Sequence, residues 1–206
     1  MPVMARLRLP LLRLMPWALV ALRALIAVGL SIDAADGQIG AWFVPGFLIA
    51  AASDIADGMI ARRLGVTTRG LRLLDSCADG FLYLGVGWSL WRVHPEILRA
   101  FAAPLKLAVG TQLLSWLWCW LKFGQVTSYH SYLAKAWGLT LIWATVRCFA
   151  WGQGGWSLWL AIVVGIASHA EDLLMTCLLR QWAYDVPHLP AAWRRRTAAQ
   201  HAGSSS

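Results

Sequence analysis

Apolar residues dominate six stretches of the chain, and each stretch has roughly the length of a membrane-crossing helix. The stretches run over residues 16–32, 41–61, 74–92, 98–121, 136–151 and 156–179. A helix needs about 20 mainly apolar residues to cross the hydrocarbon core of a bilayer. The pattern therefore predicts an all-α, polytopic membrane protein with six transmembrane helices and short connections.

The segment before the first stretch has a different pattern, in which arginines alternate with leucines. Leu7, Leu11 and Leu14 recur at helical spacing there, so the segment is typical of an amphipathic helix that lies in the membrane interface. These patterns divide the chain into three parts. We expect an interfacial segment at 1–15, a six-helix transmembrane domain at 16–182 and a cytoplasmic tail at 183–206.

The composition supports this division and excludes other classes of protein. Hydrophobic residues make up 59% of the 206 residues and charged residues only 14%. Soluble globular domains have about 25% charged residues. The chain therefore lacks the polar surface of a soluble domain, and it is too apolar to be a disordered segment.

The net charge of +8 is placed as in a membrane protein. Arginines cluster at alternate ends of successive apolar stretches, as in Arg62 and Arg63 after the second and Arg194 to Arg196 near the end of the chain. The positive-inside rule then predicts that both termini are cytoplasmic. We expect the protein to be integral to a bacterial inner membrane. We expect anionic membrane lipids as partners of these arginines, and no nucleic acid.

The second apolar stretch contains residues that are costly in a membrane. Asp54, Asp57, Gly58, Ala61 and Arg62 follow the helical offsets 0, 3, 4, 7 and 8, so they share one face of a helix. Two carboxylates on this face suit a divalent cation. Gly58 and Ala61 leave the face open to a bulky ligand, and Arg62 can clamp a phosphate.

Two further carboxylates follow, because twelve residues separate Arg62 from Asp75, and Asp79 comes one helical turn later. The predicted topology places all four aspartates at a similar depth, on the cytoplasmic side of the membrane. Four carboxylates at one depth repel one another unless cations neutralise them. Their hard oxygen ligands indicate Mg²⁺ or Mn²⁺.

Two interpretations without catalysis remain open at this point. The aspartates are also compatible with a membrane carrier or channel that binds a cation. Gly58 and Ala61 are alternatively the small contact residues of a helix–helix interface.

The order and spacing of these residues resemble the signature of the CDP-alcohol phosphatidyltransferase family. The matching pattern is Asp54-x-x-Asp57-Gly58-x-x-Ala61-Arg62, followed by Asp75-x-x-x-Asp79. Seven residues separate Arg62 from Gly70, where the family pattern has eight, so this glycine is displaced by one position.

The resemblance implies a metal-dependent enzyme that transfers a substituted phosphate from a CDP-linked donor to an alcohol and releases CMP. Two Mg²⁺ or Mn²⁺ ions would be bound by Asp54, Asp57, Asp75 and Asp79, with Asp79 also the catalytic general base. CDP-diacylglycerol would bind at Asp57, Gly58, Ala61 and Arg62. The resemblance also implies a cytoplasmic active site and a homodimer.

The acceptor is expected to be a small polyol, with glycerol 3-phosphate first and inositol phosphate or inositol as the alternative. Arg72, Ser131 and Lys135 are the candidate acceptor-binding residues, since the resemblance implies basic residues in this region for a phosphorylated acceptor. Lys135 is equally compatible with an interfacial anchor whose amine reaches water.

The first and last stretches contain further charges, and the sequence assigns no role to Lys106 or Arg147. Arg23 in the first stretch and Glu171 and Asp172 in the last have similar predicted depths. Opposite charges at one depth offset the cost of burying each. We therefore expect Arg23 to face the interior of the bundle and to pair with Glu171 or Asp172.

Overall fold

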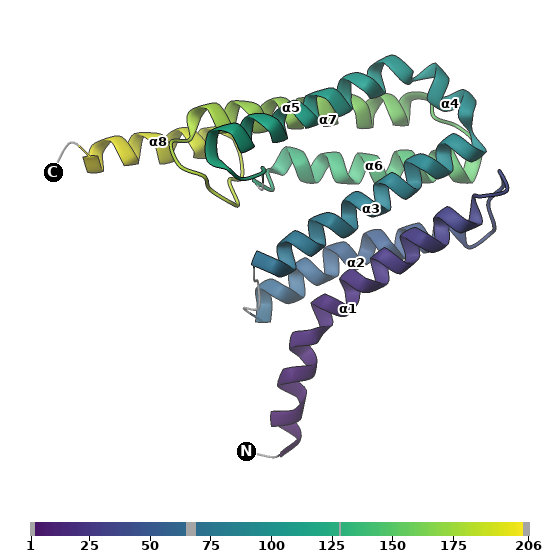
Figure 1. Ribbon diagram of the computed structural model, residues 1–206, viewed down its shortest axis with the longest axis horizontal. Helices are drawn as coiled ribbons and strands as arrows, with labels where there is room; N and C mark the ends of the chain where they lie inside the picture. Colours follow the sequence, from purple (N-terminus) through teal and green to yellow (C-terminus); the bar gives the residue numbers. More distant parts are fainter. Residues whose placement is uncertain (1–2, 65–68, 128, 204–206) are drawn as a thin grey trace. The chain divides into compact units, whose positions relative to one another are not determined.

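The computed structural model describes residues 3–64, 69–127 and 129–203, and the side chains of residues 15–60, 74–127 and 129–197. The described residues form helices and no strand, which confirms the all-α prediction (Figure 1). The helices are α1 (Val3–Asp33), α2 (Phe43–Leu64), α3 (Arg69–Val93), α4 (Pro95–Ala100), α5 (Ala102–Phe123), α6 (Tyr132–Trp151), α7 (Gly155–Leu178) and α8 (Leu189–Gly203).

The six predicted spans fall largely on α1, α2, α3, α5, α6 and α7, in that order. Three stretches within the described residues are long and apolar enough to cross a membrane. They are Met15–Asp33, Phe43–Ile60 and Gly155–Leu178. The structure thus supports the first, second and sixth predicted spans by their length and composition.

Two helices lie where the apolar pattern did not predict them. The short helix α4 begins at Pro95, a residue whose fixed φ suits the first turn of a helix, and it overlaps the start of the fourth predicted span. The helix α8 lies inside the segment that we assigned to the cytoplasmic tail. Its sequence is rich in alanine and arginine, which are strong helix formers, but it lacks the long apolar stretch from which we predicted the other helices.

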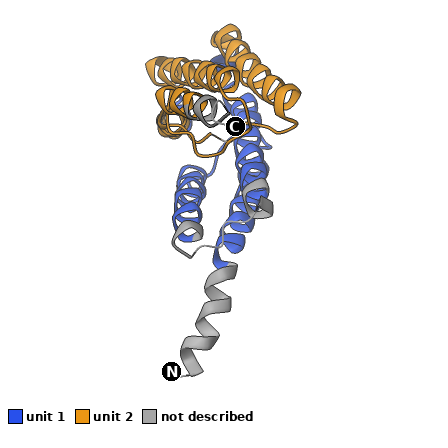
Figure 2. Ribbon diagram, turned by 90° about the vertical axis from the view of Figure 1, so that its left-hand side faces the viewer, with its two compact units in different colours: residues 1–98, 148–152 blue, residues 99–147, 153–206 orange. Residues whose placement is uncertain are grey.

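The chain forms two compact units (Figure 2). Unit 1 comprises Met1–Leu98 and Cys148–Gly152, and unit 2 comprises Arg99–Arg147 and Gln153–Ser206. In unit 1, α1 packs along both α2 and α3. In unit 2, α5 packs along α7, and α8 contacts the same helix.

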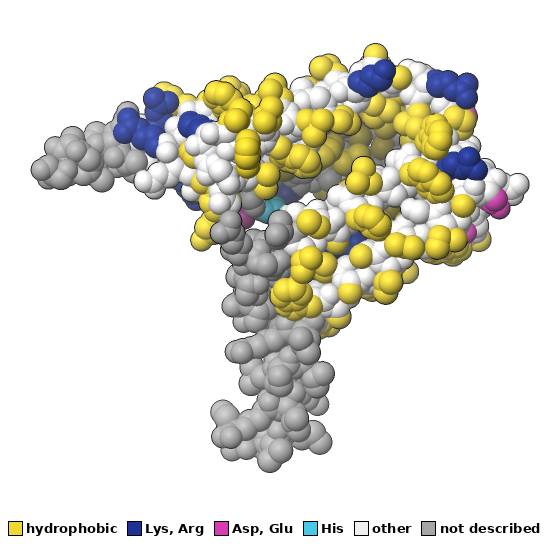
Figure 3. Space-filling model, viewed as in Figure 1, with side chains coloured by type: hydrophobic (Ala, Val, Ile, Leu, Met, Phe, Trp, Pro, Cys, Tyr) yellow, Lys and Arg dark blue, Asp and Glu magenta, His cyan; other side chains and the backbone are white. Residues whose placement is uncertain are grey.

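The interior of unit 1 is built from small and aromatic side chains, whereas many large apolar side chains lie on its surface. The buried set includes Ala27, Leu30, Phe43, Phe47, Ala50 and Leu82. Leu25 and Ile32 of α1 are 70% and 69% exposed. On the face in Figure 3, hydrophobic side chains cover much of the coloured surface, and most of the visible Lys and Arg side chains lie toward its left and right margins. This is the surface that a lipid environment requires.

Unit 2 is held together at the C-terminal end of α7. Lys122 of α5 donates hydrogen bonds from Nζ to the carbonyl oxygens of Thr176, Cys177 and Leu179, at 2.8, 3.0 and 2.9 Å. The Tyr129 hydroxyl lies 2.8 Å from Thr176 Oγ1, and burial raises the pKa of this phenol. A cation that binds the last carbonyl groups of a helix stabilises that helix end.

Gly85 permits the close approach of α3 to α1. A Cβ at this position would lie 2.8 Å from Ser31 Oγ and 3.3 Å from the Ala27 carbonyl oxygen. Ser31 Oγ already donates to that carbonyl oxygen, so it has little freedom to move away. Gly87 on the same helix has no heavy atom within 4 Å of the corresponding point among the described residues.

We predict that Gly85→Ala lowers the melting temperature of the purified protein in detergent, because the added methyl group separates α1 from α3. Overpacking of this kind costs about 1–3 kcal/mol. The matched control is Gly87→Ala, which gains the same helix propensity without the clash and should be neutral or stabilising. Equal melting temperatures for the two variants would contradict the proposed close approach.

Candidate metal centre

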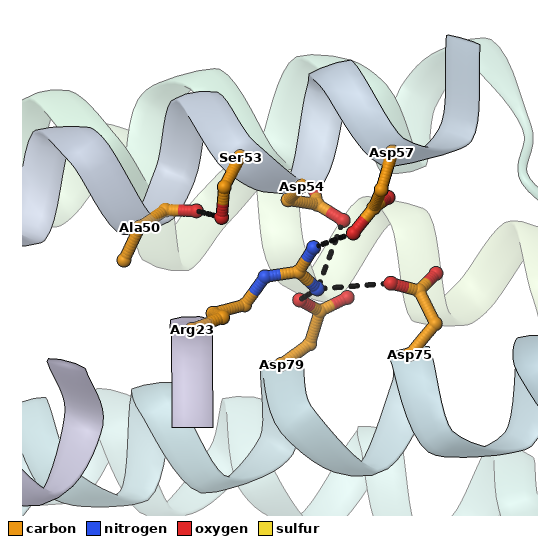
Figure 4. Close-up of polar contacts among 7 residues, drawn as sticks. All are labelled: Arg23, Ala50, Ser53, Asp54, Asp57, Asp75 and Asp79. Carbon is orange, nitrogen blue, oxygen red and sulfur yellow. Dashed lines mark hydrogen bonds and ion pairs between the residues drawn. The ribbon is translucent and has the colours of Figure 1, made fainter. Parts of the chain in front are cut away.

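The candidate site lies entirely in unit 1 and is organised around Arg23. This side chain of α1 has no solvent-exposed surface. Figure 4 shows its guanidinium between Asp54 and Asp57 of α2 and Asp75 and Asp79 of α3. Each pair of aspartates is spaced by one helical turn, so both members of a pair project from the same face of their helix.

All four aspartates form ion pairs with the guanidinium. Nη1 lies 3.2 Å from Asp54 Oδ1, 2.9 Å from Asp75 Oδ1 and 2.5 Å from Asp79 Oδ1. Nη2 donates a hydrogen bond to Asp57 Oδ2. The four residues that the sequence pattern singled out from two separate helices are therefore brought together in one cluster.

The cluster is open on one side. The side chain of Asp57 is 4% exposed, whereas those of Asp54, Asp75 and Asp79 are 43%, 28% and 36% exposed. Asp57 thus anchors the interior of the cluster against Arg23. The other three carboxylates are accessible to a ligand.

The donor set fits a divalent cation. One oxygen each from Asp54, Asp57 and Asp75 lies within 4.8 Å of the other two, so the three residues can share an ion. Asp79 is linked to this triad through Arg23. A single guanidinium offsets only one of the four negative charges, and carboxylate oxygens are the ligands that Mg²⁺ and Mn²⁺ prefer. Next to Asp54, Ser53 Oγ donates a hydrogen bond to the Ala50 carbonyl oxygen of its own helix.

The structure places some of the other predicted site residues and not others. Gly58 is half-buried on α2, one residue after Asp57. Ala61 and Arg62 belong to the last turn of α2, and the displaced Gly70 and Arg72 belong to the first turn of α3. The side chains of Ala61, Arg62 and Arg72 lie outside the described residues.

The two predicted acceptor-binding residues of unit 2 differ in their surroundings. Ser131 is buried, and its Oγ accepts a hydrogen bond of 3.1 Å from the Ala134 amide, so it caps the N-terminus of α6. Lys135 is exposed, and its Nζ lies 5.3 Å from the centre of the Tyr132 ring. Lys135 therefore has an amine that is accessible to a ligand, whereas the Ser131 oxygen already binds the backbone.

The observed partners of Arg23 are ones that we did not predict. Arg23 is buried as predicted, and the carboxylates with which it pairs within unit 1 are the four aspartates. Glu171 accepts a hydrogen bond from the Leu189 amide at the start of α8. The signal was present in the sequence, because the four aspartates carry the largest negative charge at the predicted depth of Arg23.

We compared the chain with models of known protein families. The model of the CDP-alcohol phosphatidyltransferase family matches residues 3–167, which include Arg23 and all four aspartates. The chain belongs to this family. No curated protein and no solved structure matches the chain at the level of similarity that we required.

Membership defines the general chemistry. CDP-alcohol phosphatidyltransferases are membrane phosphotransferases that act on a CDP-alcohol and an alcohol acceptor, generally with a divalent metal. The three membrane-length apolar stretches agree with a membrane location. Within the aspartate cluster of this phosphatidyltransferase, Asp54, Asp57 and Asp75 could hold such a metal.

We predict that Arg23→Gln destabilises the phosphatidyltransferase strongly in EDTA, because it leaves four carboxylates without a counter-charge. Breaking a buried ion pair costs about 3–5 kcal/mol. MnCl₂ should restore part of the lost melting temperature in detergent, since Mn²⁺ neutralises the same oxygens.

The matched control is Arg92→Gln, which removes an exposed arginine of α3 that donates to the Ala35 carbonyl oxygen. Its melting temperature should change little and should show the wild-type response to Mn²⁺. A loss in Arg23→Gln that Mn²⁺ does not relieve would show that Arg23 does not share its carboxylates with a metal.

Proposed function

We propose that this phosphatidyltransferase moves the phosphatidyl group of CDP-diacylglycerol to a hydroxyl of a small phosphorylated polyol and releases CMP. Glycerol 3-phosphate is the acceptor that we favour, which is the activity of a phosphatidylglycerophosphate synthase. The observation that carries the proposal is the convergence of Asp54, Asp57, Asp75 and Asp79 around one buried guanidinium.

Asp54, Asp57, Asp75 and Asp79 are the proposed ligands of two Mg²⁺ or Mn²⁺ ions. Such ions, when bound, neutralise the donor diphosphate and stabilise the departing CMP. Within the chain, buried Asp57 holds its carboxylate in place through the ion pair with Arg23. Asp54, Asp75 and Asp79 are the more exposed carboxylates, so a metal ion that they hold would be open to a diphosphate.

Asp79 is the proposed general base. It takes the proton of the acceptor hydroxyl as that oxygen forms a bond to the phosphatidyl phosphorus, and the phosphorus–oxygen bond to CMP breaks. Its side chain is partly exposed, and it lies one turn from Asp75 on the same helix face. This position suits proton transfer beside the proposed metal-binding carboxylates.

Gly58, Ala61 and Arg62 are the proposed contacts of the CDP moiety. Small side chains at the first two positions let a bulky ligand approach the backbone of α2, and a guanidinium at the third can bind the diphosphate in a bidentate manner. The acyl chains of the donor remain in the lipid next to the helices, which explains why such a site belongs in a membrane protein.

The acceptor side is proposed from the resemblance of the sequence to the family. Lys135 and Arg72 are the candidate phosphate-binding residues, together with Ser131. Inositol phosphate and inositol are the alternative acceptors. A non-enzymatic cation carrier is the alternative from another class, and it is disfavoured because the family consists of phosphotransferases.

The topology belongs to the same proposal. We propose six transmembrane helices, an active site that faces the cytoplasm, cytoplasmic termini and a homodimer in a bacterial inner membrane. The arginine clusters that flank the apolar stretches support this orientation.

Incubation of the purified protein with CDP-diacylglycerol, Mg²⁺ or Mn²⁺ and one radiolabelled acceptor at a time tests the substrate assignment. Glycerol 3-phosphate should give a labelled lipid and equimolar CMP, whereas glycerol without its phosphate should not. Formation of a labelled lipid with inositol phosphate alone would identify inositol phosphate as the acceptor and leave the proposed transfer reaction unchanged. A cation flux without CMP release would favour the carrier.

We predict that Asp79→Asn lowers transfer more than about 100-fold, because the amide cannot take the acceptor proton. Binding of CDP-diacylglycerol should remain close to wild type, since Asp54, Asp57 and Asp75 still provide oxygen ligands. CMP release and donor affinity are measured on the same preparation. Asp36→Asn, on an exposed turn outside the cluster, is the charge-matched control. Retention of a tenth of the wild-type turnover would refute the general-base assignment.

We also predict that Asp54→Ala and Asp57→Ala each lose the dependence of donor binding on metal, because each removes a charge that the cation needs. The measurement is the affinity for CDP-diacylglycerol across a Mg²⁺ titration. Asp57→Ala should additionally lower the melting temperature, because its carboxylate is the buried partner of Arg23. Wild-type Mg²⁺ titration curves in both variants would exclude these two residues as metal ligands.

A further inference from the structure

Two cavities adjoin the corner between the C-terminal end of α7 and α8 in unit 2. The first is a groove of about 880 Å³ lined by Leu174, Cys177, Leu178, Leu189, Pro190, Trp193 and Arg194. The second is smaller, about 380 Å³, and is lined by Leu179, Arg180, Gln181, Trp182, Ala183, Arg195 and Arg196. One cavity is therefore mainly apolar, and its neighbour is basic.

The corner has a defined structure. The Leu189 amide donates to Glu171 Oε1 at 3.2 Å, and the Ala191 amide donates to His188 Nδ1 at 3.1 Å, so the first turn of α8 is capped twice. Behind it, Met175, Leu179, Val186 and Ala192 are buried in one cluster with Tyr129. These contacts fix the direction in which α8 leaves α7.

Helix α8 presents different chemistry on different sides. Leu189 and Trp193, one turn apart, lie in the apolar groove, and Ala192 is buried in the core. Arg195 and Arg196 lie in the basic cavity, opposite Arg180 from the connection after α7. Neither cavity lining contains an aspartate or glutamate.

Arg195 is held in place at the rim of the basic cavity. Its guanidinium donates to the carbonyl oxygens of Tyr184 and Asp185, each at 3.4 Å. A guanidinium has five N–H donors, so further donors are available for an anion. The carboxylate of Asp185 is not part of the lining.

We propose that this corner binds an anionic glycerophospholipid. The lipid phosphate lies against Arg180, Arg195 and Arg196, and one acyl chain occupies the groove beside Leu174, Leu178 and Trp193. Guanidinium groups bind phosphate oxygens in a bidentate manner, and basic pockets next to membrane-crossing helices suit anionic headgroups. The apolar groove argues for a lipid as the source of the phosphate, because free phosphate gains nothing from it.

The neighbouring surface supports a lipid occupant. Leu174 on α7 and Trp193 on α8 are 53% and 56% exposed, and α7 is one of the helices that can cross a membrane. A tryptophan beside arginines at a helix end is the usual arrangement at the membrane–water interface. The site uses none of the four aspartates and does not depend on the proposed acceptor.

Native mass spectrometry of the full-length protein, released from bilayers of phosphatidylcholine containing phosphatidylglycerol, tests this proposal by counting the lipids retained. The wild type should retain phosphatidylglycerol in preference to phosphatidylcholine. Arg195→Gln with Arg196→Gln should reduce this retention about 30-fold, at about 1 kcal/mol per arginine. The control pair Arg99→Gln with Lys106→Gln removes the same charge from exposed positions of unit 2 and should retain the lipid as the wild type does.

Three further measurements separate the alternatives. Trp193→Ala should weaken retention of long-chain phosphatidylglycerol, because it removes one wall of the groove. Inorganic phosphate should not displace the lipid at equal concentration, and displacement would identify a free-phosphate site instead. Arg180 lies outside α8, so Arg180→Gln tests the basic cavity even if the double variant fails to fold, and it should also reduce retention of phosphatidylglycerol. Equal retention of the two lipids, or equal losses in the double variant and its control, would overturn the proposal.

Discussion

The mutual repulsion of four carboxylates, and its relief by Arg23, is the constraint on which unit 1 depends. Asp54 and Asp57 on α2 face Asp75 and Asp79 on α3, and the guanidinium from α1 contacts all four. Without that charge, the helices would carry four like charges into a region of low polarity, at a cost of several kcal/mol. The same cluster therefore links the three helices and brings together carboxylate oxygens of Asp54, Asp57 and Asp75 that could hold a metal ion.

The packing of unit 1 is adapted to this arrangement. Buried positions on α1 and α2 include the small residues Ala27 and Ala50, and Gly85 lets α3 approach the α1 backbone. Close helix contacts shorten the distance that the Arg23 side chain must span. Large apolar residues such as Leu25 remain on the outside, where they face lipid and not a protein core.

The sequence predicted the elements with long, regular patterns. The apolar stretches located the main helices, and the offsets of Asp54, Asp57, Asp75 and Asp79 predicted that two helix faces would meet at one acidic site. It did not predict α8, because a helix that is stabilised by two N-terminal caps and by docking on α7 needs no long apolar run.

The partners of Arg23 were not predicted, for a related reason. Helical rise gives depth along the membrane normal but not which helices are neighbours. Glu171 and Asp172 had a depth similar to that of Arg23, and only the packing of α1 against α2 and α3 selects the aspartates. The match of the family model to residues 3–167 connects this packing to phosphatidyl transfer.

The most direct measurement is anomalous scattering at the manganese edge from crystals of the protein grown with Mn²⁺. The account predicts two anomalous peaks between α2 and α3, within coordination distance of oxygens from Asp54, Asp57, Asp75 and Asp79. Peaks elsewhere, with these four carboxylates bound only to Arg23, would contradict the assignment of the cluster as the metal centre of the enzyme.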